Sequence, residues 1–246
     1  GYGCTLQIGG SDQWGNLVAG TGLIRSVEGA TAHAITIPLS TKPDGTKYGK
    51  TEGGAIWISA DLLPPYSFYQ FWLNVADAEV PGLLRVYSFK SREEIEALIA
   101  DSVERPAARA GQRALAEEIT TLVHGAAECR RAIAASQALF GQGDLSTVDE
   151  RTLEAAKAEV PSFDLKLGEA NLPPVVDLMV GTGIESSKSG ARRAIEGGGA
   201  YLNNHKVTDV DAKPTSADLL HGRFLILRRG KRTIGAVEVV GAGPQP

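Results

Sequence analysis

The chain has 246 residues, 43% hydrophobic and 22% charged, which is enough for about two or three small domains with sizeable cores. No apolar run approaches the roughly 18 residues that a membrane span needs, so the predicted location is the cytoplasm. Cys4 and Cys129 match no metal-ligand spacing, which argues against a disulfide framework and against a protein-bound metal site.

The net charge of −4 is unevenly distributed along the chain. Residues 1–175 carry 15 Lys and Arg against 22 Asp and Glu, a net −7. Residues 176–246 carry 10 against 7, a net +3. Because a polyanion is attracted to clustered positive charge, the C-terminal segment is the predicted docking place for such a partner.

The first predicted element is a short apolar strand over 5–8, followed by two glycines and a helix capped by Ser11 or Asp12. In open α/β sheets, ligands bind at the carboxyl ends of strands, where glycines let the backbone approach a phosphate or ribose. The candidate ligand contacts around this turn are Gln7, Gly9, Gly10, Asp12 and Gln13. The alternative is an ordinary capped turn, for which a Gly-Gly-Ser-Asp run is equally suitable.

A second strand is predicted over 33–37, as the last parallel strand of the same sheet, because its β-branched residues alternate. The loop after it places Lys47 and Lys50 three residues apart among glycines, with Thr51 next. Two ammonium groups in such a loop suit a polyphosphate whose charge shifts during a reaction, although Lys-x-x-Lys pairs are commonly solvated. A P-loop is excluded because three residues, rather than four, separate the glycines.

A domain boundary is predicted near residue 62, since a Pro-Pro pair and a dense aromatic helix follow it. The pattern is helical from there to about residue 140, and Ser91 with Glu94 predicts a capping box. Residues 141–174 contain Gly, Pro and Ser around one short helical pattern. They are therefore predicted to form a semi-ordered linker.

The tail is predicted to hold a helix capped by Ser187, then a tight hairpin at Asn203–Asn204 and a second hairpin over 223–240. Cations recur on the exposed side of the helix and on the first hairpin. These candidate RNA-binding residues are Lys188, Arg192, Arg193, His205 and Lys206. The alternative is a small basic α/β domain whose charges are simply solvated.

Three segments together resemble bacterial tyrosyl-tRNA synthetases, which are class I aminoacyl-tRNA synthetases: Gly-Gly-Ser-Asp-Gln-Trp-Gly-Asn at 9–16, Thr-Ile-Pro-Leu at 36–39, and the lysine loop at 44–52. The pattern from 187 to 207 resembles an S4-type RNA-binding domain. The resemblance implies four parts, in chain order: an α/β remnant of a Rossmann-like class I catalytic domain (1–61), an all-α anticodon-binding domain (62–140), a linker (141–174) and a small α+β S4-like RNA-binding domain (175–246).

The resemblance implies a tyrosine–tRNA ligase that activates tyrosine with ATP, accompanied by Mg²⁺, and transfers it to tRNA-Tyr. Lys47 and Lys50 are then expected to neutralise the leaving pyrophosphate, with Thr51 donating from its hydroxyl. Gly10 and Asp12 are expected to hold the adenosine ribose. The two glutamines, one in the strand and one after the glycines, are expected to form hydrogen bonds with the tyrosine and its activated carboxyl.

The family also carries a His-Ile-Gly-His type motif, and the four histidines here sit in no such context. The chain is therefore expected to be a C-terminal portion that lacks the first half of the catalytic domain and is inactive by itself. The resemblance implies a homodimer for the full-length protein, and we expect neither DNA nor a membrane as partner. The alternative is a non-catalytic RNA-binding fragment or paralogue that acts through its helical and S4-like domains.

Overall fold

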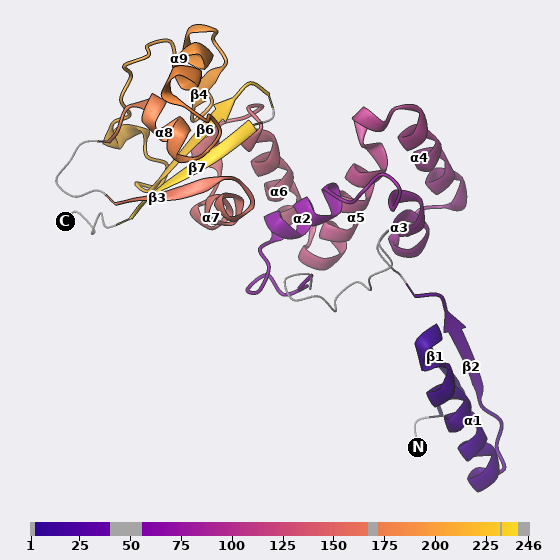
Figure 1. Cartoon of the computed structure of the whole chain (residues 1–246). Coiled ribbons are helices and arrows are strands. Elements are labelled where there is room, and N and C mark those ends of the chain that lie inside the picture. The colour runs from indigo at the N-terminus through magenta and orange to yellow at the C-terminus, as the bar shows by residue number, and fades with distance from the viewer. Residues whose placement is uncertain (1–2, 40–55, 167–171, 232, 241–246) are drawn as a thin grey trace. The chain divides into compact units, whose positions relative to one another are not determined.

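The structure is a computed structural model that describes residues 3–39, 56–166, 172–231 and 233–240 (Figure 1). The chain divides into two compact units, a first unit of Gly1–Ile56 and a second unit of Trp57–Pro246. Within the described ranges, no helix is long and apolar enough to cross a membrane.

The first unit consists of β1 (Leu6–Gly10), η1 (Ser11–Gln13), α1 (Trp14–Glu28) and β2 (His33–Ile37). The two strands are parallel, and Gly10 lies opposite Ile37 at their carboxyl ends. Both predicted strands are confirmed. Helix α1 ends at Gly29, whose left-handed φ of 64° reverses the chain toward β2.

The start of α1 differs from the prediction. Ser11 and Asp12 lie in the short 3-10 helix η1, and Gln13 occupies the cap position of α1 without a side-chain hydrogen bond. Gly10 is still extended, with φ −65° and ψ 161°, so the chain passes through a tight 3-10 turn before the α-helix begins. The prediction of a helix N-cap at Ser11 or Asp12 is therefore wrong.

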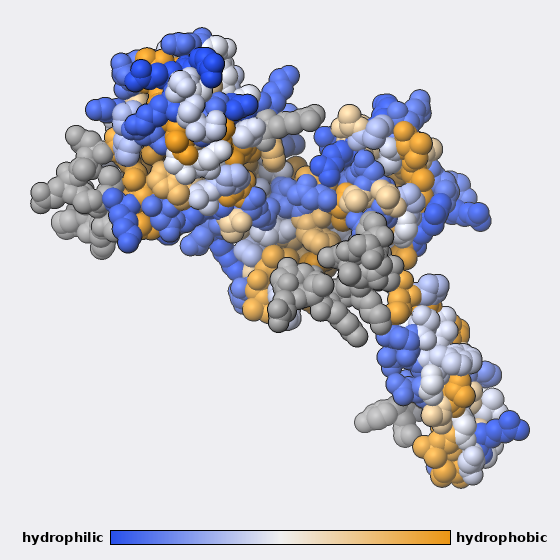
Figure 2. All heavy atoms as spheres, in the orientation of Figure 1, coloured by the Kyte–Doolittle hydropathy of each residue, from blue (hydrophilic) through white to orange (hydrophobic). Residues whose placement is uncertain are grey.

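One face of the two-stranded sheet is exposed. Leu6, Ile8, Ile35 and Ile37, which we call the open apolar face, are 45%, 60%, 49% and 55% exposed. Helix α1 packs on the other face, where Leu17 is buried. Figure 2 accordingly shows orange patches on the surface of this unit.

The second unit begins with a helical part, made of α2 (Pro65–Leu73), α3 (Val80–Tyr87), α4 (Arg92–Glu104), η2 (Pro106–Ala108), α5 (Ala110–His124) and α6 (Ala126–Leu139). The predicted capping box is confirmed, because Ser91 Oγ accepts from the Glu94 amide while the Glu94 carboxylate accepts from the Ser91 amide. Helix α2 packs against α5 and α6 through the aromatic side chains that the sequence placed there.

The rest of the second unit consists of η3 (Leu145–Thr147), α7 (Glu150–Glu159), β3 (Ser162–Lys166), α8 (Val175–Gly181), α9 (Lys188–Glu196), β4 (Ala200–Leu202), β5 (His205–Lys206), η4 (Ser216–Asp218), β6 (Phe224–Arg229) and β7 (Thr233–Val240). The strands form one sheet in the order β3-β7-β6-β4-β5, in which β3 and β7 alone are parallel. Both predicted hairpins are confirmed, as β4–β5 and β6–β7.

Apolar side chains are buried on both faces of this sheet. One face packs against α8 and α9 in a core that includes Leu178, Ile195 and Leu225. The other face packs against the end of α6, α7 and Tyr66 of α2, in a second core that includes Phe224. The sheet therefore shares its second core with the helical part.

The described residues 141–166 contain more regular structure than the predicted semi-ordered linker. They contain η3, α7 and β3, and Leu145 and Leu153 are buried in the second core. Strand β3 extends the sheet by pairing with β7. Leu145 and Leu153 lie between α6 and the sheet, an environment that the local Gly, Pro and Ser content does not indicate.

Candidate functional site

Four predicted ligand-contacting residues lie at the carboxyl end of β1 and in the turn after it: Gly9, Gly10, Asp12 and Gln13. A Cβ atom added to Gly10 would lie 2.7 Å from Asp12 Oδ1 and 2.8 Å from the Leu39 side chain. The Asp12 carboxylate therefore lies directly beside the Gly10 backbone, where any larger residue would displace it. Asp12 is exposed, and its carboxylate can accept hydrogen bonds from hydroxyl groups.

The two glutamines are placed differently. A Cβ atom on Gly9 would lie 3.1 Å from Gln13 Cβ, so Gln13 packs on the glycine turn, and its Oε1 accepts a 3.0 Å hydrogen bond from Asn16 Nδ2. Gln7 lies earlier in β1, with its Oε1 3.8 Å from the position of a Cβ on Gly20 of α1. Gln7 is therefore on the side of β1 that faces α1.

The predicted catalytic residues Lys47, Lys50 and Thr51 lie outside the described residues. They follow β2, whose carboxyl end is paired with the glycine end of β1. Where the structure does describe the chain, no group of three or more His, Cys, Asp or Glu side chains is arranged to hold a metal ion.

The predicted RNA-binding residues lie on α9 and on the β4–β5 hairpin. Ser187 caps α9 as predicted, and Lys188, Arg192 and Arg193 are exposed on this helix. Lys188 Nζ is 2.7 Å from Asp177 Oδ1 of α8. That carboxylate offsets the charge of Lys188, which leaves Arg192 and Arg193 as the more available cations of the predicted set on this helix.

The tight turn predicted at the two asparagines is confirmed: Asn203 and Asn204 have positive φ angles of 46° and 67°. His205 and Lys206 are exposed on β5. A Cβ atom on Gly198 would lie 2.5 Å from Lys206 Nζ, so this ammonium is at the C-terminal end of α9. A cation is favourable there because the C-terminal end of a helix carries partial negative charge. The Lys206 side chain therefore connects the β4–β5 hairpin with α9.

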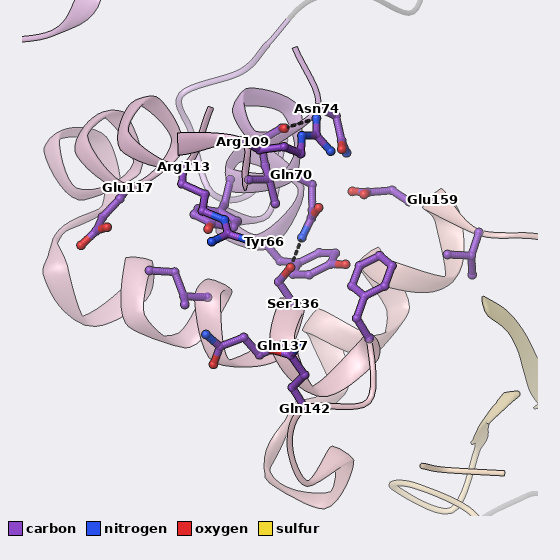
Figure 3. Close-up of a pocket in the computed structure, with 15 residues that line it drawn as sticks. Tyr66, Gln70, Asn74, Arg109, Arg113, Glu117, Ser136, Gln137, Gln142 and Glu159 are labelled. Atoms are coloured by element: carbon purple, nitrogen blue, oxygen red, sulfur yellow. Dashed lines mark hydrogen bonds between the residues drawn. The ribbon is translucent and has the colours of Figure 1, made fainter. Parts of the chain in front are cut away.

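The helical part contains a cavity of about 520 Å³, lined by residues of α2, α5, α6 and the end of α7 (Figure 3). In its wall, Gln70 Nε2 donates a 2.8 Å hydrogen bond to Ser136 Oγ, and both side chains are buried. An adjoining cavity of about 960 Å³ shares five of its lining residues: Asn74, Arg109, Arg113, Phe140 and Gln142.

The lining groups of this cavity suit a nucleotide. Arg109 and Arg113 lie one helical turn apart and offer guanidinium donors to a phosphate. Arg109 is oriented by a 2.6 Å hydrogen bond from its Nη2 to the Leu73 carbonyl oxygen. The half-exposed Phe140 ring can stack on a base, and the Gln142 amide can both donate to and accept from a base edge.

Away from the two arginines, the cavity is lined by a partly buried carboxyl group and a buried phenol, those of Glu159 and Tyr66. Burial raises the pKa of the Glu159 carboxyl, while a hydrogen bond with Ser67 acts against that shift. Burial also raises the pKa of the Tyr66 phenol, and the charge of Glu159 adds to the increase. The cavity therefore combines a cationic part with a partly desolvated part.

The sequence does not indicate this cavity as a site. Arg109 and Arg113 are four residues apart, one at the N-cap of α5 and one in its first turn, and that pair is the one local signal in the sequence. The remaining lining residues are Glu117, on the same helix as Arg113, and residues of 66–74, 133–142 and 159–160. Because these segments are distant in sequence, no local pattern indicates that they meet.

Two family models match the chain. Residues 2–141 match the model described as class I tRNA synthetases (W and Y), and residues 152–236 match the tyrosine–tRNA ligase SYY-like C-terminal domain. The tyrosine–tRNA ligase of Thermobifida fusca is 60% identical over 240 residues, covering 96% of this chain and 56% of that protein. The tyrosine–tRNA ligase of Streptomyces griseus is 58% identical over 243 residues, covering 98% of this chain and 56% of that protein.

The chain thus spans about half the length of the curated relatives that it matches. Among solved structures, a C-terminally truncated mitochondrial tyrosyl-tRNA synthetase of Coccidioides posadasii is 28% identical. That match covers 52% of this chain and 38% of the other, with a TM-score of 0.45.

Proposed function

The chain belongs to the tyrosyl-tRNA synthetase family of the class I tRNA synthetases, and on that premise we propose that the whole protein is a tyrosine–tRNA ligase. It joins tyrosine to ATP, releases pyrophosphate and passes tyrosine to the terminal adenosine of tRNA-Tyr. The observation that carries the proposal is the match of residues 2–141 to the family model. The whole protein acts as a homodimer in the cytoplasm.

In the activation step, the tyrosine carboxylate attacks the α-phosphate of ATP, so no nucleophilic side chain is required. The protein contributes positioning and stabilisation of the charge that develops on the pyrophosphate. Lys47 and Lys50 supply that charge stabilisation, and Thr51 donates a hydrogen bond from its hydroxyl. Mg²⁺ accompanies ATP as part of the substrate.

The first unit supplies the nucleotide contacts of a Rossmann-like fold. Asp12 accepts from the adenosine ribose while Gly10 allows its close approach, a role supported by the contact between the Asp12 carboxylate and the Gly10 backbone. Gln13, on the same turn, and Gln7, on the helix side of β1, bond the tyrosine and its activated carboxyl.

The second unit supplies the tRNA contacts. Its residues 62–140 form an anticodon-binding domain, in which the cavity beside Arg109 and Arg113 receives an unstacked nucleotide of the anticodon loop. Its residues 175–246 form an S4-like domain that contacts the phosphates of the long variable arm. The net charge of +3 on 176–246 within an acidic chain supports this second surface.

Activation is tested by replacing Lys47 or Lys50 with Ala in a full-length context and measuring tyrosine-dependent ATP–pyrophosphate exchange. Each substitution is expected to raise the activation barrier by about 2 to 4 kcal/mol while leaving tyrosine affinity almost unchanged, because the loop acts mainly in the transition state. Weaker tyrosine binding with an unchanged activation rate would contradict this assignment.

RNA binding is tested by a gel-shift titration of tRNA-Tyr at two salt concentrations with an Arg192→Glu, Arg193→Glu double variant. The matched control is Arg130→Glu, Arg131→Glu, which changes the same number of charges on exposed residues of α6. The first variant is expected to lose affinity and to reduce the salt slope by roughly 0.7 to 0.9 per lost phosphate contact. Equal behaviour of the two variants would show that net charge alone matters.

A second candidate function is a non-catalytic RNA-binding protein that uses the second unit. One observation favours it: both hydrophobic cores that the structure describes lie in the second unit. The intact mass of the natural gene product discriminates between the two functions. A product of about this chain's mass that binds tRNA-Tyr without supporting exchange would favour the second.

A further inference from the structure

The loop from Phe140 to Gly143, which follows α6, contacts two parts of the second unit. Phe140 and Gln142 line the cavity of Figure 3. The backbone of Gly141 and Gly143 contacts residues of the sheet. The loop therefore lies between the proposed nucleotide pocket and the sheet. We call the five predicted RNA-binding residues the basic face, and two of them, His205 and Lys206, lie on strand β5 of this sheet.

The first connection is made by Asn204 of the β4–β5 turn. Its Nδ2 donates to the carbonyl oxygen of Ala138 at 2.7 Å and to that of Gly143 at 3.0 Å. The Ala138 carbonyl oxygen also accepts from the Gly141 amide at 3.0 Å, so the side-chain donor adds to a backbone bond at the C-terminal end of α6. Asn204 thereby fixes both ends of the loop to the turn that precedes His205.

The second connection is made by Arg228 of β6. Its guanidinium carbon is 4.0 Å from the centre of the Tyr201 ring, and a Cβ atom on Gly141 would lie 2.8 Å from the same carbon. Arg228 is 8% exposed, and its Nη1 donates to the Gly230 carbonyl oxygen. The guanidinium is therefore packed between an aromatic ring of the sheet and the backbone of the loop.

Gly141 is adapted to this contact in two ways. Its φ of 85° is unfavourable for other residues, and the space beside its Cα is taken by Arg228. Arg228 also has an Nε without a hydrogen-bond partner among the described residues. A buried guanidinium with incomplete hydrogen bonding is costly, and the packing against the Tyr201 ring and the loop offsets part of that cost.

We propose that Asn204 and Arg228 are positioning residues that hold the loop so that Phe140 and Gln142 face the cavity. They fix the distance between the nucleotide pocket and the basic face, so that one tRNA contacts both surfaces without first ordering them. Two contact surfaces at a fixed, matching distance bind more tightly than the same surfaces on a mobile connection. This inference rests on the proposed RNA-binding function.

The experiment compares Asn204→Gly with Asn203→Gly in the 246-residue chain. Glycine tolerates the left-handed φ at either position, so both variants keep the turn and lose one amide. The Asn203 amide bonds the Asp218 carbonyl oxygen and the Ile226 amide, both within the C-terminal segment. Only the Asn204 amide reaches α6, which makes Asn203→Gly the matched control.

Binding of a tRNA-Tyr transcript and of its isolated variable-arm hairpin is measured for each variant, together with hydrogen exchange at the Gly141 and Gln142 amides. For Asn204→Gly we expect about tenfold weaker binding of the whole tRNA, unchanged binding of the hairpin, and faster exchange at both amides. For Asn203→Gly we expect no such difference between the two RNAs. Arg228→Met, which keeps side-chain length, is expected to behave like Asn204→Gly.

Equal losses in the two asparagine variants, or no loss of tRNA affinity in Asn204→Gly, would overturn the inference. A wild-type chain that binds neither RNA would instead refute the proposed RNA-binding function. The two failures are therefore distinguishable from the wild-type titration.

Discussion

The two units of the chain differ in what covers their apolar side chains. In the described part of the first unit, Leu17 is the one buried residue, and the open apolar face is at least 45% exposed. In the second unit, the sheet has a core on each face, one beneath α8 and α9 and the other shared with the helical part. Regular strands and helices form in both, but only the second surrounds its sheet with packed side chains.

The difference also applies to the two candidate sites. Around the β1 turn, Asp12 and Gln13 are exposed, and the residues of the lysine loop lie outside the described part. In the cavity of the second unit, Gln70 and Ser136 are buried and bonded to each other. Because buried, hydrogen-bonded side chains are held in one geometry, the second site is the more completely formed of the two.

The largest expected effect is a difference in stability loss between a substitution in the second unit and one in the first. Leu153→Ala, at a fully buried position of the second core, is expected to lower the free energy of unfolding by about 2 to 5 kcal/mol, since it leaves a cavity. Ile35→Ala, at a position that is 49% exposed on β2, should cost less than about 1 kcal/mol. Urea denaturation of both variants measures the difference, and similar losses would remove the distinction between the units.

A smaller effect is expected at Gly141, where the loop meets the sheet. Gly141→Ala and Gly125→Ala both introduce a Cβ at a positive φ, of 85° and 86°. At Gly125 nothing lies within 4 Å of the new atom, whereas at Gly141 it meets the Arg228 guanidinium. The Gly125 variant should lose about 1 kcal/mol from strain alone, and the Gly141 variant at least 1 kcal/mol more, by thermal unfolding. Identical losses would mean that Arg228 moves aside freely.

A modest pH dependence is expected from Glu238 of β7. Hydrogen bonds from Lys157 of α7 and then from Arg223 hold the pKa of its carboxyl below the ordinary value of 4.5. A carboxyl with a depressed folded-state pKa stabilises the fold above its unfolded pKa, and this contribution disappears as the pH falls through the folded value. Glu238→Gln should therefore flatten the acid limb of stability below about pH 4.5. An unchanged acid limb would contradict this role.

The smallest effect on stability is expected on the open apolar face. Ile35→Thr with Ile37→Thr should change the free energy of unfolding by no more than about 0.5 kcal/mol for each site, because both residues are already exposed. The same double variant should self-associate less than the wild type in light scattering, since contiguous exposed apolar surface promotes association. A large loss of stability would mean that this face is covered in the folded protein.

The sequence by itself determined the features that depend on neighbouring residues. Its motifs indicated the family, which the family models and relatives confirm. Ser187 and the Ser91–Glu94 pair act as the caps that their spacing predicts, and Asn203–Asn204 forms the tight turn. Each of these depends on hydrogen bonds or backbone angles within a few residues, so the local sequence contains the necessary information.

Only the tertiary structure decided the features that depend on distant residues. The start of α1 shifted because Gly10 remains extended as part of the paired strand. The regular structure within residues 145–166 depends on surfaces far apart in sequence, which bury Leu145 and Leu153 between them. The cavity and the contact between Arg228 and Gly141 are likewise formed by residues that are distant in sequence. Burial is a property of the space around a residue, and that space is filled by segments whose approach no local periodicity specifies.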